Sequence, residues 1–103
     1  DRFGSETDLL ITDMEKASAL ADCLVDSDVA IMRGHGATIY GRTLPEAVYR
    51  AIYAELNAQI LLNSAAIGTF KALSAGECKA TVERISPQIE RAWDLWVREV
   101  ERD

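Results

Sequence analysis

The sequence lacks any apolar run long enough to cross a membrane, and its basic residues nowhere cluster beyond a pair. A membrane-spanning helix needs about 20 consecutive apolar residues. Binding to nucleic acid or to an anionic membrane surface usually needs a basic patch, and the net charge here is −6. We therefore expect no nucleic acid and no membrane among the main partners.

Cysteine and histidine are also scarce, with only Cys23, Cys78 and His35 in the chain. The two cysteines are far apart and fit neither a CxxC motif nor a dense disulfide framework. Their simplest role is as small core or surface residues in a reducing compartment. No signal-peptide pattern stands within the 103 residues, and we expect a cytoplasmic protein.

What the chain does contain is typical of one small globular domain. Hydrophobic residues make up 49% of it and charged residues 27%, which argues against disorder. The chain begins at Asp1 without a methionine, so we expect a processed protein or a piece of a longer one.

Two short strands are predicted around a glycine-rich turn. Val29–Met32 is apolar and partly β-branched, which fits a strand buried on both faces. The turn Arg33-Gly34-His35-Gly36 follows, and Ala37–Tyr40 fits a second strand. Since two strands are too few for an independent sheet, we expect this pair to complete a sheet whose other strands come from elsewhere.

Helical periodicity and capping boxes predict about four helices around these strands. The first should begin after Thr12, with Glu15 completing its capping box, and the last should begin at Pro87 and carry Trp93 and Trp96 on its apolar face. Both tryptophans favour a core or oligomer contact over a cofactor site. The expected ranges are 13–25, 44–67, 74–84 and 87–100.

The order of these features resembles the class II aldolase/adducin family over about residues 8–80. Shared features are the apolar strand, the His-Gly turn, a second strand that ends at Gly41, a capped helix with Glu55-x-x-Ala58, and a following glycine. The resemblance implies an α/β fold, a three-layer α/β/α sandwich. In that family's terms, residues 1–103 would be the C-terminal half of a single domain, an incomplete portion with two short strands and about four helices, whose N-terminal half is absent.

The same resemblance implies a function. Family members include metal-dependent aldolases, epimerases, dehydratases and decarboxylases that act through a metal-stabilised enolate on small hydroxy or keto substrates. The divalent metal, usually Zn²⁺, is held by three histidines, and His35 corresponds to the third. Members commonly form homotetramers, so a homo-oligomer and a small-molecule substrate are expected here.

The sequence departs from the family because it has no His-x-His pair and no catalytic glutamate ahead of the turn. A catalytic zinc needs about three protein ligands. We therefore expect the 103 residues alone to bind zinc poorly and to be inactive, with the catalytic residues in the absent half. An adducin-like interaction module without chemistry is the alternative, and a His-x-His pair upstream would decide for the enzyme.

Four further residues are candidates near the site. Gly34 and Gly36 flank His35 and leave room for a sharp turn and for a substrate. Arg33 could face an anionic substrate group or form a surface salt bridge. Glu55 lies on an apolar stripe, where it could orient a ligand, bond a buried backbone group, or meet an arginine at a subunit boundary.

Overall fold

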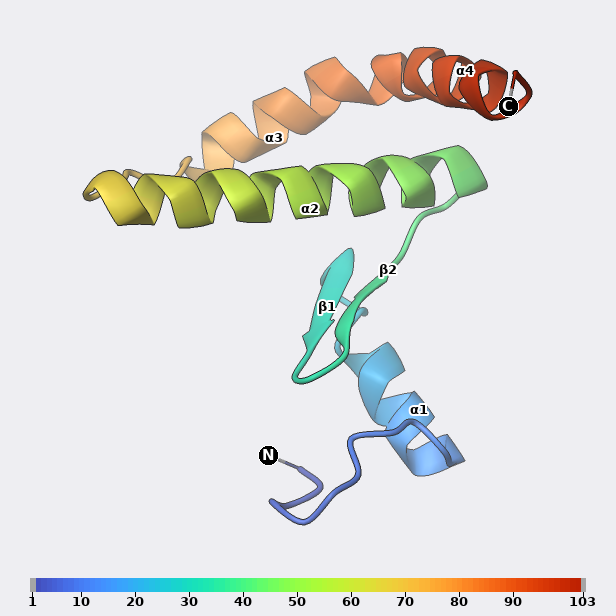
Figure 1. Cartoon of the computed structure of the whole chain (residues 1–103), viewed down its shortest axis with the longest axis vertical. Helices are drawn as coiled ribbons and strands as arrows, with labels where there is room; N and C mark the ends of the chain where they lie inside the picture. The colour runs from blue at the N-terminus through green and yellow to red at the C-terminus, as the bar shows by residue number, and fades with distance from the viewer. Residues whose placement is uncertain (1, 103) are drawn as a thin grey trace. The chain divides into compact units, whose positions relative to one another are not determined.

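The structure, a computed structural model, describes residues 2–102, and the chain divides into two compact units. The first unit ends at Tyr40 and the second begins at Gly41. The elements are α1 (Met14–Asp22), β1 (Val29–Met32), β2 (Gly36–Ile39), α2 (Leu44–Ile67), α3 (Ala75–Ile85), a 3₁₀ turn (Ser86–Gln88) and α4 (Ile89–Val100) (Figure 1). The mixed α/β class is confirmed. Residues 2–102 by themselves form one two-stranded sheet rather than a layered sandwich.

Helix α1 is shorter than predicted and is capped one residue later. The carboxylate of Asp13, not the hydroxyl of Thr12, accepts the hydrogen bond from the Lys16 amide, at 2.8 Å. This bond lowers the pKa of Asp13. The helix ends at Asp22 because the amides of Cys23 and Leu24 bond three residues back, which tightens the last turn into a 3₁₀ form.

Strands β1 and β2 pair antiparallel, as the sequence predicted. The register runs from Val29 opposite Ile39 to Met32 opposite Gly36, so β2 begins one residue earlier than expected. Within residues 2–102 one face of β1 is uncovered, so burial on both faces stays a prediction that depends on strands from elsewhere. Ala30 is buried, but the next side chain, on the opposite face, is Ile31, and it is 86% exposed.

Helix α2 spans 24 residues with the predicted bounds. The Thr43 hydroxyl accepts a hydrogen bond from the Glu46 amide at 3.3 Å, and Pro45 lies in the first turn, where a missing N–H costs little. At the other end, the Gly68 amide donates to the Ser64 carbonyl at 3.2 Å. Local capping therefore sets both ends of this helix.

Glu46 is only 8% exposed, and its carboxylate bonds to Arg42 rather than closing a capping box with Thr43. Its Oε2 accepts from the Arg42 amide at 2.7 Å and from Arg42 Nε at 3.3 Å. Its Oε1 accepts from Arg42 Nη2 at 3.3 Å and lies 3.1 Å from Arg50 Nη2. The Arg42 side chain, then its amide, and the charge of Arg50 together lower the pKa of Glu46 against the opposing effect of burial.

Gly41 packs directly against the first turns of α2. A Cβ built on Gly41 would lie 2.4 Å from the backbone nitrogen of Ala47, a distance that no side chain tolerates. The helix backbone thus passes so close to this position that only glycine fits.

The last two helices follow each other across the 3₁₀ turn. Ser74 and Glu77 form the predicted capping box of α3, with bonds of 3.2 and 2.7 Å, and these bonds lower the pKa of Glu77. Pro87 lies inside the 3₁₀ turn, so α4 begins two residues later than predicted, at Ile89. Helix α4 packs on α2, where the rings of Tyr49 and Trp96 have centroids 6.1 Å apart.

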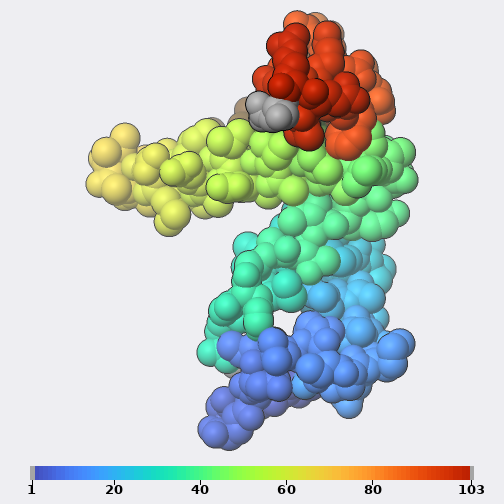
Figure 2. Space-filling model, turned by 45° about the vertical axis from the view of Figure 1, so that its right-hand side comes forward, coloured from blue at the N-terminus to red at the C-terminus, as the bar shows by residue number. Residues whose placement is uncertain are grey.

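Much apolar surface stays exposed. In the face shown in Figure 2, α4 (red) covers the beginning of α2, while the yellow end of α2 is uncovered. Leu62 and Ile67 near that end are 72% and 91% exposed. Among residues 2–102, no helix is both long and apolar enough to cross a membrane.

Replacing the buried carboxylate tests its role at the start of α2. We expect Glu46→Gln in the full-length gene product to lower the free energy of unfolding by about 1–3 kcal/mol, because charge-assisted hydrogen bonds to two arginines are weakened. Glu55→Gln on the same helix is the matched control and should change it by less than about 0.5 kcal/mol. Denaturant unfolding at neutral pH measures both.

The same carboxylate predicts a pH dependence. The pKa of Glu46 in the folded protein lies below its unfolded value of 4.5. The contribution of the ionised carboxylate to the free energy of unfolding is therefore complete above pH 4.5, and it is lost as the pH falls through the folded pKa. The stability difference between wild type and Glu46→Gln should therefore shrink below about pH 4. An unchanged difference from pH 7 to pH 3 would contradict the assignment.

Candidate functional site

The predicted site lies on the turn that joins β1 to β2. The His35 amide donates to the Met32 carbonyl at 3.2 Å, which closes a four-residue turn. Gly34, the third residue of this turn, has a φ of +81°, the value that a type II turn requires there. Gly36 has a φ of +136° and pairs with Met32 as the first residue of β2. The two glycines thus hold His35 on a tight hairpin.

The imidazole of His35 is exposed on this turn. Cys23 and Cys78 are exposed as well, and Cys23 Sγ donates to the Ala19 carbonyl at 3.2 Å. Within residues 2–102, no three His, Cys, Asp or Glu side chains are grouped so that they could hold a metal ion. His35 can supply one ligand, and these residues alone do not fit a complete metal centre. The metal prediction therefore stays a prediction.

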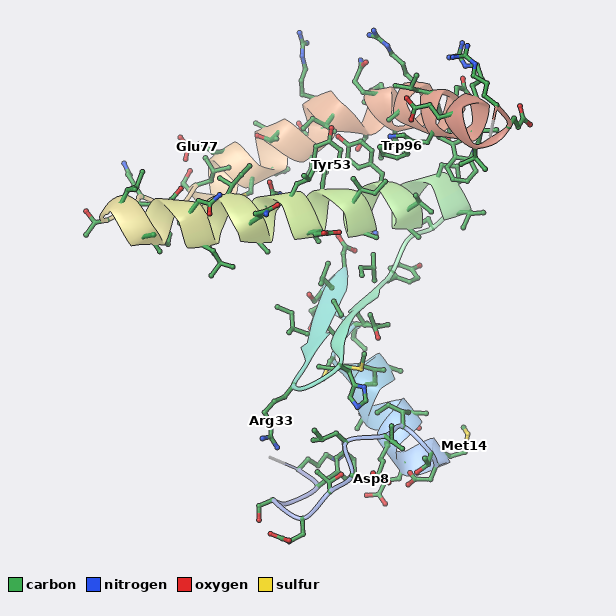
Figure 3. The ribbon with its side chains drawn as sticks, viewed as in Figure 1. Asp8, Met14, Arg33, Tyr53, Glu77 and Trp96 are labelled. Carbon is green, nitrogen blue, oxygen red and sulfur yellow. The ribbon has the colours of Figure 1, made fainter. Side chains whose placement is uncertain are left out.

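Arg33 extends from the same turn, away from the paired strands (Figure 3). It lines a hollow of about 180 Å³ within the first unit, together with Met32, Leu9 and Lys16. Lys16 is paired with Asp8 and Asp13, whereas Arg33 forms no ion pair with any residue from 2 to 102. The surface salt bridge that the sequence left open is thus not formed there, and a role toward an anionic substrate stays a prediction.

Glu55 lies in the middle of α2, in the second unit, and its side chain is exposed. It therefore bonds no buried backbone group within residues 2–102. A role in orienting a ligand or meeting an arginine at a subunit boundary is not tested by this structure.

Sequence reasoning missed the ion-pair cluster of Glu46 with Arg42 and Arg50. The available signal was the spacing, with arginines four residues before and four after a glutamate in a first helical turn. The same helix carries Tyr49 and Tyr53, four residues apart. Their rings stack with centroids 4.3 Å apart and an interplanar angle of 24°.

The part of the chain that contains the His35 hairpin matches a known protein family. The family model described as "Class II Aldolase and Adducin N-terminal domain" matches residues 2–62, more than half of the chain. The chain is therefore a member of the class II aldolase/adducin family. The match includes α1, the hairpin and most of α2, so the resemblance first drawn from the His-Gly turn is confirmed.

The chain is also similar to a curated protein. The chain is 38% identical over 113 aligned residues to "Decarboxylase tropJ" from Talaromyces stipitatus. The alignment covers 91% of this chain and 42% of that protein. The chain thus spans less than half the length of that relative, and it shares with it the lineage of a named enzyme.

The hairpin geometry makes a testable prediction at Gly34. We expect Gly34→Ala to destabilise the full-length gene product by about 1–2 kcal/mol, because φ is +81° and a Cβ would lie 2.9 Å from Leu9 Cδ1. Gly76→Ala is the matched control. That glycine lies in the first turn of α3, and a Cβ there would meet only Ser74 Oγ at 3.9 Å, an ordinary contact, so alanine should stabilise by up to about 1 kcal/mol. Thermal unfolding measures the change in stability for both variants, and the two changes should have opposite signs. A change of the same sign in both would refute the turn geometry.

Proposed function

We propose that this chain is part of a divalent-metal-dependent lyase of the decarboxylase or aldolase type. Family membership together with an imidazole held on a glycine hairpin carries the proposal. The relative that is named a decarboxylase points in the same direction. The substrate in this proposal is a small hydroxy or keto compound: a sugar phosphate, a keto or hydroxy acid, or an aromatic acid.

In this proposal His35 supplies one metal ligand, and the remaining ligands come from outside the 103 residues. Bound in such a centre, Zn²⁺ or a similar ion acts as a Lewis acid that stabilises enolate charge. The chain's own contribution is geometric. The closed turn and the strand pairing limit the positions that the imidazole can take, so a ligand atom is presented with little conformational freedom to lose.

Arg33 has a separate role in the proposal. It projects from the same turn without an ion-pair partner among the described residues, and it is two residues from His35. A guanidinium presents several donors in a planar fork that matches a carboxylate or a phosphate. Arg33 would therefore hold the anionic group of a substrate rather than the metal.

We further propose that residues 1–103 complete a larger domain and an oligomer. Two strands alone make a marginal sheet, and the uncovered faces of β1 and α2 need a cover. The rest of a single domain would supply the neighbouring strands and the missing ligands, and a second copy of the chain would cover other apolar surface. The 103 residues alone are expected to be inactive.

An adducin-like interaction module is the second candidate. The observation that favours it is the amount of exposed apolar surface, which suits a binding partner as well as it suits an enzyme subunit. This candidate requires no metal, so metal content separates the two.

Two substitutions on the same turn separate metal binding from substrate binding. In the full-length gene product, His35→Ala should remove most of the bound metal and at least about 100-fold of the activity, because one of about three ligands is lost. Arg33→Ala should keep the metal and mainly raise KM. Elemental analysis and steady-state kinetics measure both, and full metal content in His35→Ala would rule out the ligand assignment.

Chelation tests the lyase itself. The full-length gene product is assayed against sugar phosphates, 2-keto-4-hydroxy acids and hydroxylated aromatic carboxylates, before and after metal removal. We expect chelator to abolish turnover and added Zn²⁺, Mn²⁺ or Co²⁺ to restore it, because the enolate charge needs a Lewis acid. Turnover that survives complete metal removal would refute the mechanism. Absence of both turnover and bound metal would favour the interaction module.

A further inference from the structure

A groove lies between α2 and α4 in the second unit. Its volume is about 420 Å³, within the range of small-molecule sites. Tyr49 and Tyr53 of α2 form one wall, and Arg91, Leu95 and Arg98 of α4 form the other. Figure 3 shows Tyr53 and Trp96 in the space between the two helices. One groove thus combines aromatic rings with two cations.

The aromatic wall is held in place by ring contacts. Tyr49 and Tyr53 are four residues apart on α2, and their rings stack at 4.3 Å. Tyr49 also contacts the Trp96 ring, at 6.1 Å between centroids. Burial, and then the neighbouring Tyr53 phenol, raise the pKa of Tyr49. Its hydroxyl is therefore protonated at neutral pH, and the wall offers flat faces with a neutral donor.

The cationic wall comes from one face of α4. Arg91, Leu95 and Arg98 follow the spacing i, i+4, i+7, which places them in one row along the helix. The two arginines are separated by about 10 Å along the axis, at 1.5 Å per residue. Neither guanidinium forms an ion pair with a residue in the described part of the chain, and Arg98 Nε donates to the Asp94 carbonyl at 2.9 Å.

We propose that this groove binds an aromatic carboxylate. A guanidinium fork pairs with the two oxygens of a carboxylate, and the ring of the same ligand stacks on the tyrosine wall beside the Leu95 side chain. Both arginines are exposed at the edge of the groove, so their guanidiniums are free to meet an anionic group on a ligand whose ring lies on the tyrosine wall. A polyanion is disfavoured because the chain as a whole carries −6. The proposal does not depend on the lyase function.

The ligand chemistry is tested with three matched probes on the full-length gene product by calorimetric titration. Benzoate has both the ring and the charge, benzamide lacks the charge, and cyclohexanecarboxylate lacks the aromatic ring. We expect saturable benzoate binding with a Kd of about 1 mM or lower, and at least about fivefold weaker binding of the other two. No saturable benzoate binding, or equal binding of all three, would overturn the proposal.

Terephthalate carries carboxylates at both ends of one ring and tests the spacing of the arginines. It should bind more tightly than benzoate if both Arg91 and Arg98 take part. Arg91→Gln and Arg98→Gln should each remove this advantage and weaken binding by about five- to tenfold. Arg84→Gln, at an exposed arginine of α3 outside the groove, is the matched control and should bind like wild type.

Two more variants locate the bound probe. Tyr53→Leu should weaken benzoate binding by at least about threefold, whereas Tyr53→Phe should retain it because the ring is kept. His35→Ala should retain benzoate binding, since the groove does not include the turn. Binding that is lost in His35→Ala and kept in the Arg91→Gln, Arg98→Gln double variant would overturn the groove and leave the proposed lyase site untouched. Circular dichroism spectra confirm that each variant is folded.

Discussion

The second unit depends on one buried carboxylate. Glu46 holds the amide and the guanidinium of Arg42 and also the guanidinium of Arg50, so the chain that enters α2 is tied to the helix itself. The close approach at Gly41 adds a steric limit at the same place. Tyr49 follows Glu46 by three residues on the same helix, and its ring contacts Trp96 of α4. The aromatic contact between the two long helices thus rests on an electrostatic anchor a few residues away.

Features set by local physics were predictable, and features set by distant neighbours were not. The bounds of α2 and the capping box at Ser74 follow from residues within one turn of each helix end. The sequence could not predict which backbone amide would donate to the Glu46 carboxylate, because burial and the positions of Arg42 and Arg50 determine that bond. Nor could it predict that Ile31 is exposed, since the cover of a strand face comes from other strands.

The candidate site also has features set by nearby residues and features that depend on distant ones. Glycines at positive φ and the closing bond from His35 to Met32 explain why the imidazole lies on a rigid hairpin. Within residues 2–102 no group of three possible metal ligands surrounds it, and its metal role stays a prediction. Family membership connects this geometry to an enzyme lineage, and the comparison with tropJ covers 42% of that protein.

The scarcity of buried side chains also affects how these residues would unfold. Ala30 and Glu46 are the buried residues among 2–102, and no large side chain in this range is fully buried. Both the denaturant slope and the heat-capacity change of unfolding scale with the surface that unfolding newly exposes. For these residues alone we therefore expect both quantities to be small and the unfolding transition to be broad. Any partner surface that covers α2 and β1 would make the transition sharper and raise its heat-capacity step.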